Sequence, residues 1–185
     1  SCFQKDIMNL VYLCRHYGLE EIADYWERVV KINRYQQERF IRNMLGAMFN
    51  TLAGKKICLW GFAFKANTGD TRESPAIFIA RRLLEERAEI VISDPQALKN
   101  ARKDLAGLDG HISYIEDPTV AAKGCHAIAI LTEWDIYRNL DFRKIYETML
   151  QPAFIFDGRN VLDHRCCFTI GFNVYPVGKP PLTRF

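Results

Sequence analysis

The sequence predicts an α/β protein, a Rossmann-like parallel sheet flanked by helices and preceded by a helical segment with a long central helix. Residues 20–49 carry apolar side chains at helical spacing over nearly 30 positions without a proline. From residue 54 onwards, short apolar runs alternate with helical patterns, as in parallel sheets whose strands are joined by helices. Several of these runs are continuously apolar, which is typical of strands buried on both faces.

The first 53 residues are predicted to be helical. Residues 5–17 form a first helix that Gly18 ends as a C-terminal glycine. The pattern over residues 20–49 corresponds to a helix about 45 Å long at 1.5 Å per residue. Such a helix is longer than a small domain needs, so we expect residues 1–53 to be a linker between domains, a dimer interface, or both.

Residues 54–185 are predicted to form the Rossmann-like domain. The expected strands lie within residues 55–64, 89–95, 112–115, 126–134, 152–160 and 168–178. Helices are expected near residues 77–84, after an N-cap at Ser74, and at 141–150. The tail KPPLTRF is expected to be irregular because of its paired prolines. Ligands of such sheets bind beyond the carboxyl ends of the strands, so the residues that follow each apolar run are the candidates for a site.

Composition excludes several classes of function. The chain is 49% hydrophobic and 25% charged, which is typical of a globular protein, and its net charge of +3 gives no reason to expect nucleic acid or an anionic membrane as partner. No apolar run approaches the roughly 20 residues of a membrane helix. The six cysteines form no CxxC pair and the four histidines are scattered, so we expect no metal and a reducing, cytoplasmic location. The sequence shows no signal peptide and no initiating methionine, and we expect it to be processed or truncated.

The loop after the first predicted strand, GFAFKANTGDTRESPAI, lacks the GxGxxG pattern, because its glycines are only Gly61 and Gly69. It therefore gives little support to a dinucleotide pyrophosphate cradle. Lys65 and Arg72 precede the helix start at Ser74, and cations beside a helix N-terminus favour phosphate. A solvated surface loop explains the same residues equally well.

Two further strand ends carry charged residues. Asp94 could bind a ribose hydroxyl, although a capping or turn role in SDPQ is the favoured interpretation without the glycine pattern. Arg159 follows a glycine in DGRN, where it would aim a bidentate cation into the crevice unless it forms a structural ion pair. The triplet TEW at 132–134 follows another strand.

The chain opens with SCFQKD, which places Cys2 and Asp6 four residues apart on one face of the first helix. A thiol at a helix N-terminus beside Lys5 should have a lowered pKa and thiolate character. Asp6 could hold a water molecule or orient a partner group. An acid in the first turn also simply complements the helix dipole, and the cysteine could be a bystander.

Four segments, taken in order and spacing, resemble the C-terminal part of the UDP-glucose 6-dehydrogenases of the nucleotide-sugar dehydrogenase family. They are SCFQKDIMNLVYLC, FNTLAGKKICLWGFAFKANTGDTRESPA, LTEWD and FIFDGRNVLD. The resemblance covers nearly the whole chain. The FQKD after Cys2 is more similar to the UDP-glucose branch than to relatives that oxidise GDP-mannose or UDP-N-acetylmannosamine.

The resemblance implies the activity and its catalytic residues. Enzymes of this family oxidise UDP-glucose to UDP-glucuronate with two NAD+ per turnover. Cys2 would be the nucleophile that forms a thiohemiacetal and then a thioester, and Asp6 would assist acid–base or water steps.

The resemblance also implies binding residues. The cofactor-binding positions would be Cys2, Phe3, Gln4, Lys5 and Arg72. The residues that hold the UDP-sugar would be Phe64, Lys65 and Arg159.

The family's NAD-binding domain precedes the matched part, so we expect the 185-residue chain alone not to turn over UDP-glucose. Residues 20–49 would join the two domains and form a homodimer, with a higher oligomer left open. Two alternatives remain, a dehydrogenase of another UDP-sugar and a non-catalytic nucleotide-binding or dimerisation module. A redox-sensing domain that uses Cys2 or the adjacent pair Cys166–Cys167 is a weaker third.

Overall fold

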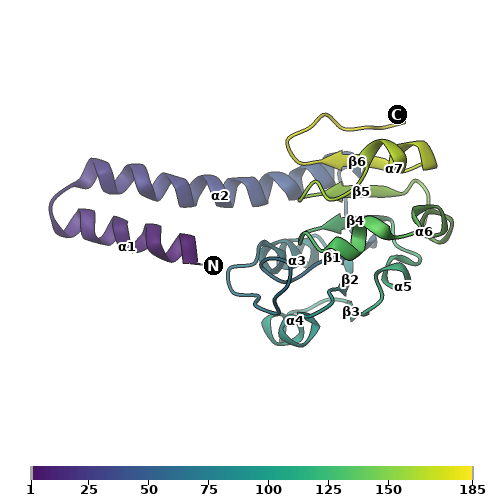
Figure 1. Ribbon diagram of the computed structural model, residues 1–185, viewed down its shortest axis with the longest axis horizontal. Coiled ribbons are helices and arrows are strands. Elements are labelled where there is room, and N and C mark those ends of the chain that lie inside the picture. Colours follow the sequence, from purple (N-terminus) through teal and green to yellow (C-terminus); the bar gives the residue numbers. More distant parts are fainter. Residues whose placement is uncertain (1, 185) are drawn as a thin grey trace.

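The computed structural model describes residues 2–184, and of Cys2 it describes the backbone alone. A helical hairpin projects from an α/β domain (Figure 1). The hairpin consists of α1 (Cys2–His16) and α2 (Glu20–Ala47). Both helices agree with the predicted ones, and Gly18, with a φ of 73°, forms the turn between them.

Helix α2 contributes to two separate cores. Near its start, Ala23 packs against the buried side of α1, which is formed by Ile7, Val11 and Cys14. Near its end, Phe40 and neighbouring apolar residues pack into the main core of the α/β domain. The predicted division of the chain at residues 53 and 54 stays a prediction.

The sheet has the strand order β3-β2-β1-β4-β5-β6, and every pairing between neighbouring strands is parallel. The strands are β1 (Lys56–Trp60), β2 (Glu89–Ser93), β3 (Ile112–Tyr114), β4 (Ala127–Ile130), β5 (Phe154–Asp157) and β6 (Asn173–Pro176). The order changes direction between β1 and β4, the arrangement that opens a ligand-binding crevice at the carboxyl ends of these strands. The predicted Rossmann-like parallel sheet is therefore confirmed.

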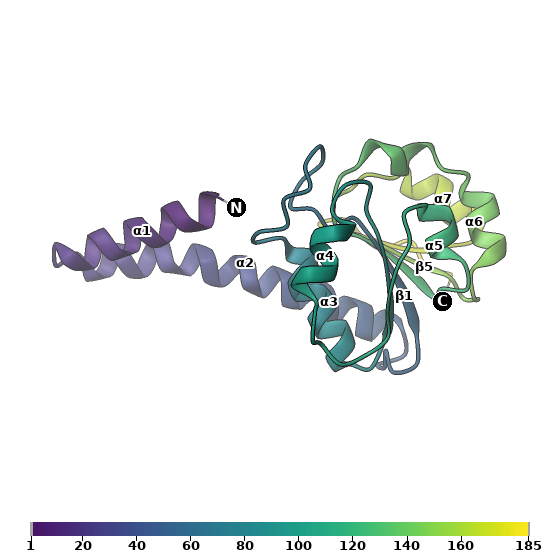
Figure 2. The same ribbon diagram turned by 90° about the horizontal axis from the view of Figure 1, so that it is seen from below.

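Helices cover both faces of the sheet (Figure 2). One face is covered by α2, α3 (Pro75–Glu85) and α4 (Leu98–Asp104), and the other by α5 (Pro118–Ala122), α6 (Phe142–Thr148) and α7 (His164–Ile170). A 3-10 helix, η1 (Asp135–Asn139), follows β4. The N-cap predicted at Ser74 is confirmed, because its side chain accepts a hydrogen bond from the Ala76 N–H.

Three sequence-based expectations differ from the structure. The strand predicted for residues 168–178 is shorter, because residues 168–170 complete α7 and β6 begins at Asn173. Helices α4, α5 and α7 were not predicted, because five to seven residues give at most two turns of periodicity; α6, with seven residues, was predicted within residues 141–150. In the tail, Leu182 forms an isolated antiparallel bridge with Val174, so the segment is not wholly irregular.

Substituting Gly61 with alanine should destabilise the domain more than the same change at Gly54. Both glycines have a positive φ, 91° and 70° respectively, so both variants carry the cost of a left-handed residue, about 1–2 kcal/mol. At Gly61 the added Cβ would also lie 2.7 Å from the backbone nitrogen of Thr132, whereas at Gly54 it would meet no atom within 4 Å. Overpacking of this kind adds about 1–3 kcal/mol. Urea unfolding of both variants measures the difference, and equal free energies of unfolding would contradict the prediction.

Candidate functional site

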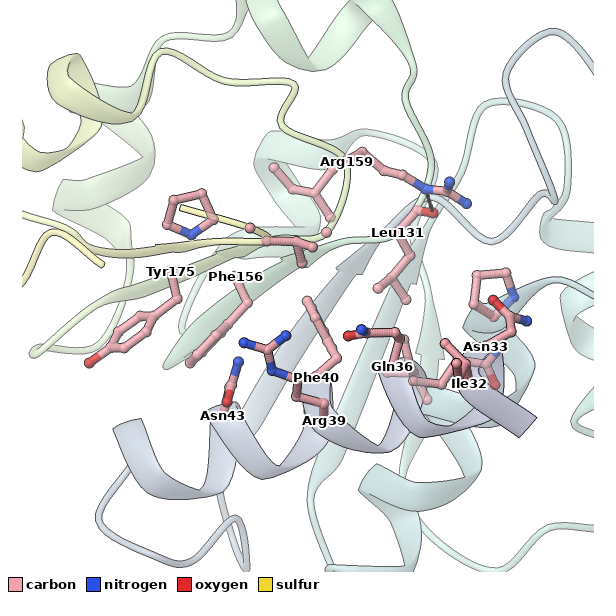
Figure 3. Close-up of a pocket in the computed structure, with 18 of the residues that line it drawn as sticks. Ile32, Asn33, Gln36, Arg39, Phe40, Asn43, Leu131, Phe156, Arg159 and Tyr175 are labelled. Carbon is pink, nitrogen blue, oxygen red and sulfur yellow. Dashed lines mark hydrogen bonds between the residues drawn. The ribbon is translucent and has the colours of Figure 1, made fainter. Parts of the chain in front are cut away.

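A cleft of about 1220 Å³ lies between α2 and the carboxyl ends of β1, β4 and β5. Figure 3 shows Phe156, Tyr175 and Arg159 of the sheet side facing Gln36, Phe40 and Asn43 of α2 across it. The first turn of α1 also reaches this cleft. Several of the sequence-predicted site residues line it: Phe3, Gln4, Phe64, Lys65 and Arg159. The structure therefore brings together residues that are up to 156 positions apart in the chain.

Of the site residues predicted in the first helix, some line the cleft and others do not. Phe3, which is 71% exposed, and Gln4 line the cleft, whereas Lys5 and Asp6 are exposed and are not among the residues that line it. The backbone of Cys2 begins α1, but its side chain lies outside the described residues. The catalytic roles of Cys2 and Asp6 stay predictions.

Arg72 lies outside the residues that line the cleft and pairs with an acid of its own loop. Its Nε and NH2 groups donate to the two carboxylate oxygens of Asp70 at 2.9 and 2.8 Å. This guanidinium lowers the pKa of Asp70 well below its usual range. The arginine is 78% exposed, and cofactor binding by it stays a prediction.

Arg159 is held at the end of β5 by the strand beside it. Its Nε donates to the Leu131 carbonyl at 2.8 Å, drawn as a dashed line in Figure 3, and lies 3.5 Å from Oε2 of Glu133. The turn itself is shaped by Asp157, which is fully buried and accepts from the Arg159 N–H at 3.0 Å. The arginine therefore forms an ion pair and also lines the cleft, and its binding role stays a prediction.

The side chain of Asp94 fixes the position of the loop after β1 through buried hydrogen bonds. Its Oδ2 accepts hydrogen bonds from the backbone N–H groups of Phe62 at 2.7 Å and Ala63 at 3.0 Å, and from Nε1 of Trp134 at 3.1 Å. Its Oδ1 accepts from the N–H groups of residues 96 and 97 within its own turn. The side chain is 1% exposed. These contacts support the capping and turn role that the sequence favoured over ribose binding.

The turn after β1 does not present a dinucleotide cradle. A pyrophosphate would need free backbone N–H groups there. The N–H groups of Phe62 and Ala63 bind Asp94, while those of Gly61 and Phe64 donate to Ser93 and Asp70 carbonyls at 2.8 Å. The amides of residues 61–64 are thus already bonded, and Phe64 and Lys65 are the residues with which this turn lines the cleft.

The described cysteines do not favour a redox site. Cys166 is exposed and Cys167 is buried, and both are free. Burial raises the pKa of Cys167 to about 12, so its reactive thiolate form is disfavoured. In the part of the chain that the structure describes, no three His, Cys, Asp or Glu residues are grouped so that they could hold a metal ion.

Sequence reasoning missed the polar face of α2 that lines the cleft. Its members recur at helical spacing: Asn33, Gln36, Arg39 and Asn43. They lie on the side of α2 that includes the buried Phe40. Polar side chains beside a core position of a helix are the sequence signal that could have indicated this part of the cleft. Sequence analysis named Glu133 only as part of the triplet TEW and assigned it no role, although it lines the cleft.

The parallel sheet and the cation-bearing cleft at its strand ends are those of the Rossmann-like α/β class. Residues 58–164 match the model of the UDP-glucose/GDP-mannose dehydrogenase family, UDP binding domain. The chain belongs to this family.

Similar proteins agree with this assignment. The chain is 46% identical to UDP-glucose 6-dehydrogenase 1 of Arabidopsis thaliana and 48% identical to UDP-glucose 6-dehydrogenase 4 of Oryza sativa, over 97% of its own length in each case. It spans 41% of the length of these two relatives. The solved structure of a UDP-glucose dehydrogenase from Pyrobaculum islandicum superposes with a TM-score of 0.76 at 30% identity, covering 95% of this chain and 36% of that one.

No helix within residues 2–184 combines the length and the apolar character needed to cross a membrane.

Replacing Asp94 with alanine should destabilise the domain strongly. The change leaves the buried N–H groups of Phe62 and Ala63 and the Trp134 indole without their acceptor. Each unsatisfied buried donor costs about 1–3 kcal/mol, so we expect a total loss of at least about 3 kcal/mol. The free energy of unfolding in urea measures it, with Asp109→Ala at an exposed position as control. A loss no larger than that of the control would show that Asp94 does not hold the loop.

Proposed function

We propose that this chain supplies the UDP-sugar-binding domain and the nucleophile of an NAD-dependent UDP-glucose 6-dehydrogenase. The observation that carries the proposal is the convergence of Phe64, Lys65 and Arg159 in one cleft with the start of α1. Membership of the family and the similarity to plant UDP-glucose 6-dehydrogenases support it.

The cleft suits a nucleoside diphosphate bound to a sugar. Lys65 follows β1 and Arg159 follows β5, the two strands on either side of β4, and both residues line the cleft. Arginine and lysine are the side chains that bind phosphate oxygens most effectively. Phe64 is half-buried beside them and offers an aromatic surface. In this proposal the two cations bind the diphosphate.

The first turn of α1 is the proposed site of reaction on the sugar. The backbone of Cys2 begins the helix, where the helix dipole favours a thiolate. We propose that this thiolate adds to the aldehyde carbon to give a thiohemiacetal, that loss of a hydride to NAD+ would convert it to the thioester, and that water then releases the acid and frees the thiolate. Asp6 would assist the proton transfers. Phe3 and Gln4 extend the same turn into the cleft.

NAD+ would accept the hydrides, but residues 2–184 form no dinucleotide cradle at the turn after β1. This chain would therefore contact the cofactor with few residues rather than enclose it. The proposed contacts are Cys2, Phe3, Gln4, Lys5 and Arg72.

The hairpin supports a partner for this part of the chain. Its two helices and the turn between them expose large apolar side chains: Phe3, Met8, Tyr12, Leu13, Tyr17, Leu19, Ile22, Tyr25, Ile32 and Tyr35. An apolar surface of this extent is typical of protein interfaces. We propose a cytoplasmic homodimer that forms through residues 20–49.

UDP should raise the melting temperature of the purified chain, and Lys65→Ala and Arg159→Ala should each reduce that increase. A ligand that binds only the folded state stabilises it. A charge-assisted contact contributes about 1.5–3 kcal/mol, so each variant should weaken UDP affinity about tenfold or more. Differential scanning fluorimetry and calorimetric titration measure both effects.

The matched controls for this experiment are Lys99→Ala and Arg81→Ala, which remove exposed cations that do not line the cleft. If wild-type chain showed no shift with millimolar UDP, the proposed binding site would be wrong.

The purified 185-residue chain should not produce NADH from UDP-glucose and NAD+, because the amides of residues 61–64 in the turn after β1, where a Rossmann-like domain would hold the pyrophosphate, are bonded to Asp94 and to backbone carbonyls. Absorbance at 340 nm over several hours measures this. NADH formation above the rate of a Cys2→Ser control would refute the expectation and would identify a complete active site in this chain.

A further inference from the structure

The triplet Thr132, Glu133 and Trp134 follows β4 after one intervening residue, Leu131, and contacts the loop that carries Lys65. The hydroxyl of Thr132 donates to the Ala63 carbonyl at 2.6 Å. The indole of Trp134 donates to Asp94, the carboxylate that accepts from the same loop. Thr132 is fully buried and Trp134 nearly so. Their buried hydrogen bonds therefore give both residues a structural role, which is to hold the loop in place.

Glu133, between them, differs because its side chain is 41% exposed and faces the cleft. One carboxylate oxygen, Oε1, accepts from the backbone N–H of Ala66 at 3.4 Å, and Ala66 directly follows Lys65. The other oxygen, Oε2, lies 3.5 Å from Nε of Arg159. A single carboxylate thus bridges the two segments that carry the cations of the cleft.

We propose that Glu133 is a positioning residue for diphosphate binding, which sets the separation between the Lys65 loop and the Arg159 guanidinium before the ligand arrives. The proposal rests on the proposed function, since it assigns Glu133 a role only if Lys65 and Arg159 bind the phosphates.

The physical argument is preorganisation. Arginine and lysine lose much rotamer freedom when they bind, and a site whose donors are already held loses less. Arg159 is held at Nε by the Leu131 carbonyl and by Glu133, so its remaining N–H groups are directed by these two contacts. The hydrogen bond from the Ala66 N–H to Glu133 restrains the loop at the position next to Lys65.

A competing effect has the opposite sign. The carboxylate of Glu133 would repel an anionic ligand in the same cleft, and it partly neutralises Arg159. At 41% exposure this repulsion is reduced by solvent. Restraint and repulsion therefore predict opposite results when the side chain is removed, which makes the proposal testable.

The test compares Glu133→Ala and Glu133→Gln by calorimetric titration of the whole chain with UDP. Alanine removes both contacts and should weaken affinity about tenfold. Glutamine keeps an oxygen that can accept from the Ala66 N–H, so its affinity should remain within about threefold of wild type. Glu147→Ala, at an exposed position on α6, is the matched control and should bind as wild type does.

A double-mutant cycle separates positioning from a general loss of structure. In the Arg159→Ala background, Glu133→Ala should reduce UDP affinity by much less than its effect in wild type, because one of the two groups it positions is gone. Urea unfolding without ligand should show that Glu133→Ala remains folded.

Affinity of Glu133→Ala equal to or above wild type would overturn the inference and show that repulsion dominates. Full additivity with Arg159→Ala, or equal losses for the Gln and Ala variants, would also overturn it. If the wild-type chain failed to bind UDP at all, the proposed function would fall with it. Binding by wild type with unaffected Glu133 variants would refute only this inference.

Discussion

The buried carboxylate of Asp94 connects three segments on which the cleft depends. It accepts from backbone N–H groups of the loop after β1, from those of its own turn after β2, and from the indole of Trp134 after β4. A desolvated carboxylate is tolerated only when such donors surround it. Because these bonds are short and buried, the loop that carries Phe64 and Lys65 has a defined position relative to β4.

The same bonds determine how the cleft can recognise a ligand. Rossmann-like domains that bind dinucleotides present amides of the first turn to the pyrophosphate. Here those amides are bonded to Asp94 and to backbone carbonyls, and the loop presents an aromatic and a cationic side chain instead. Recognition of phosphate then depends on Lys65 and Arg159, and thereby on the contacts that orient them.

Helix α2 relates this cleft to the hairpin. Its end is anchored in the main core, where Phe40 packs at a ring separation of 6.3 Å from Phe156, and its start is paired with α1. A continuous helix transmits position along its length because its backbone hydrogen bonds are made within the segment. The first turn of α1 thus lies near the cleft, because α1 runs from there to the far end of the hairpin and α2 runs back to the domain (Figure 1).

The sequence by itself determined the long helix, the alternation of strands and helices, and the family segments with their candidate residues. These signals are local, because periodicity, caps and continuous apolar runs are properties of neighbouring residues. The short helices α4, α5 and α7 were not predicted, because so few residues show little periodicity. The start of β6 was predicted too early, because the end of α7 is also apolar. Only the tertiary structure decided that Phe3, Gln4, Phe64, Lys65 and Arg159 share a cleft, that Arg72 pairs with Asp70, and that Glu133 touches both cation-bearing segments. Strand order and the path of the hairpin set those relations, and both arise from packing between segments far apart in the chain.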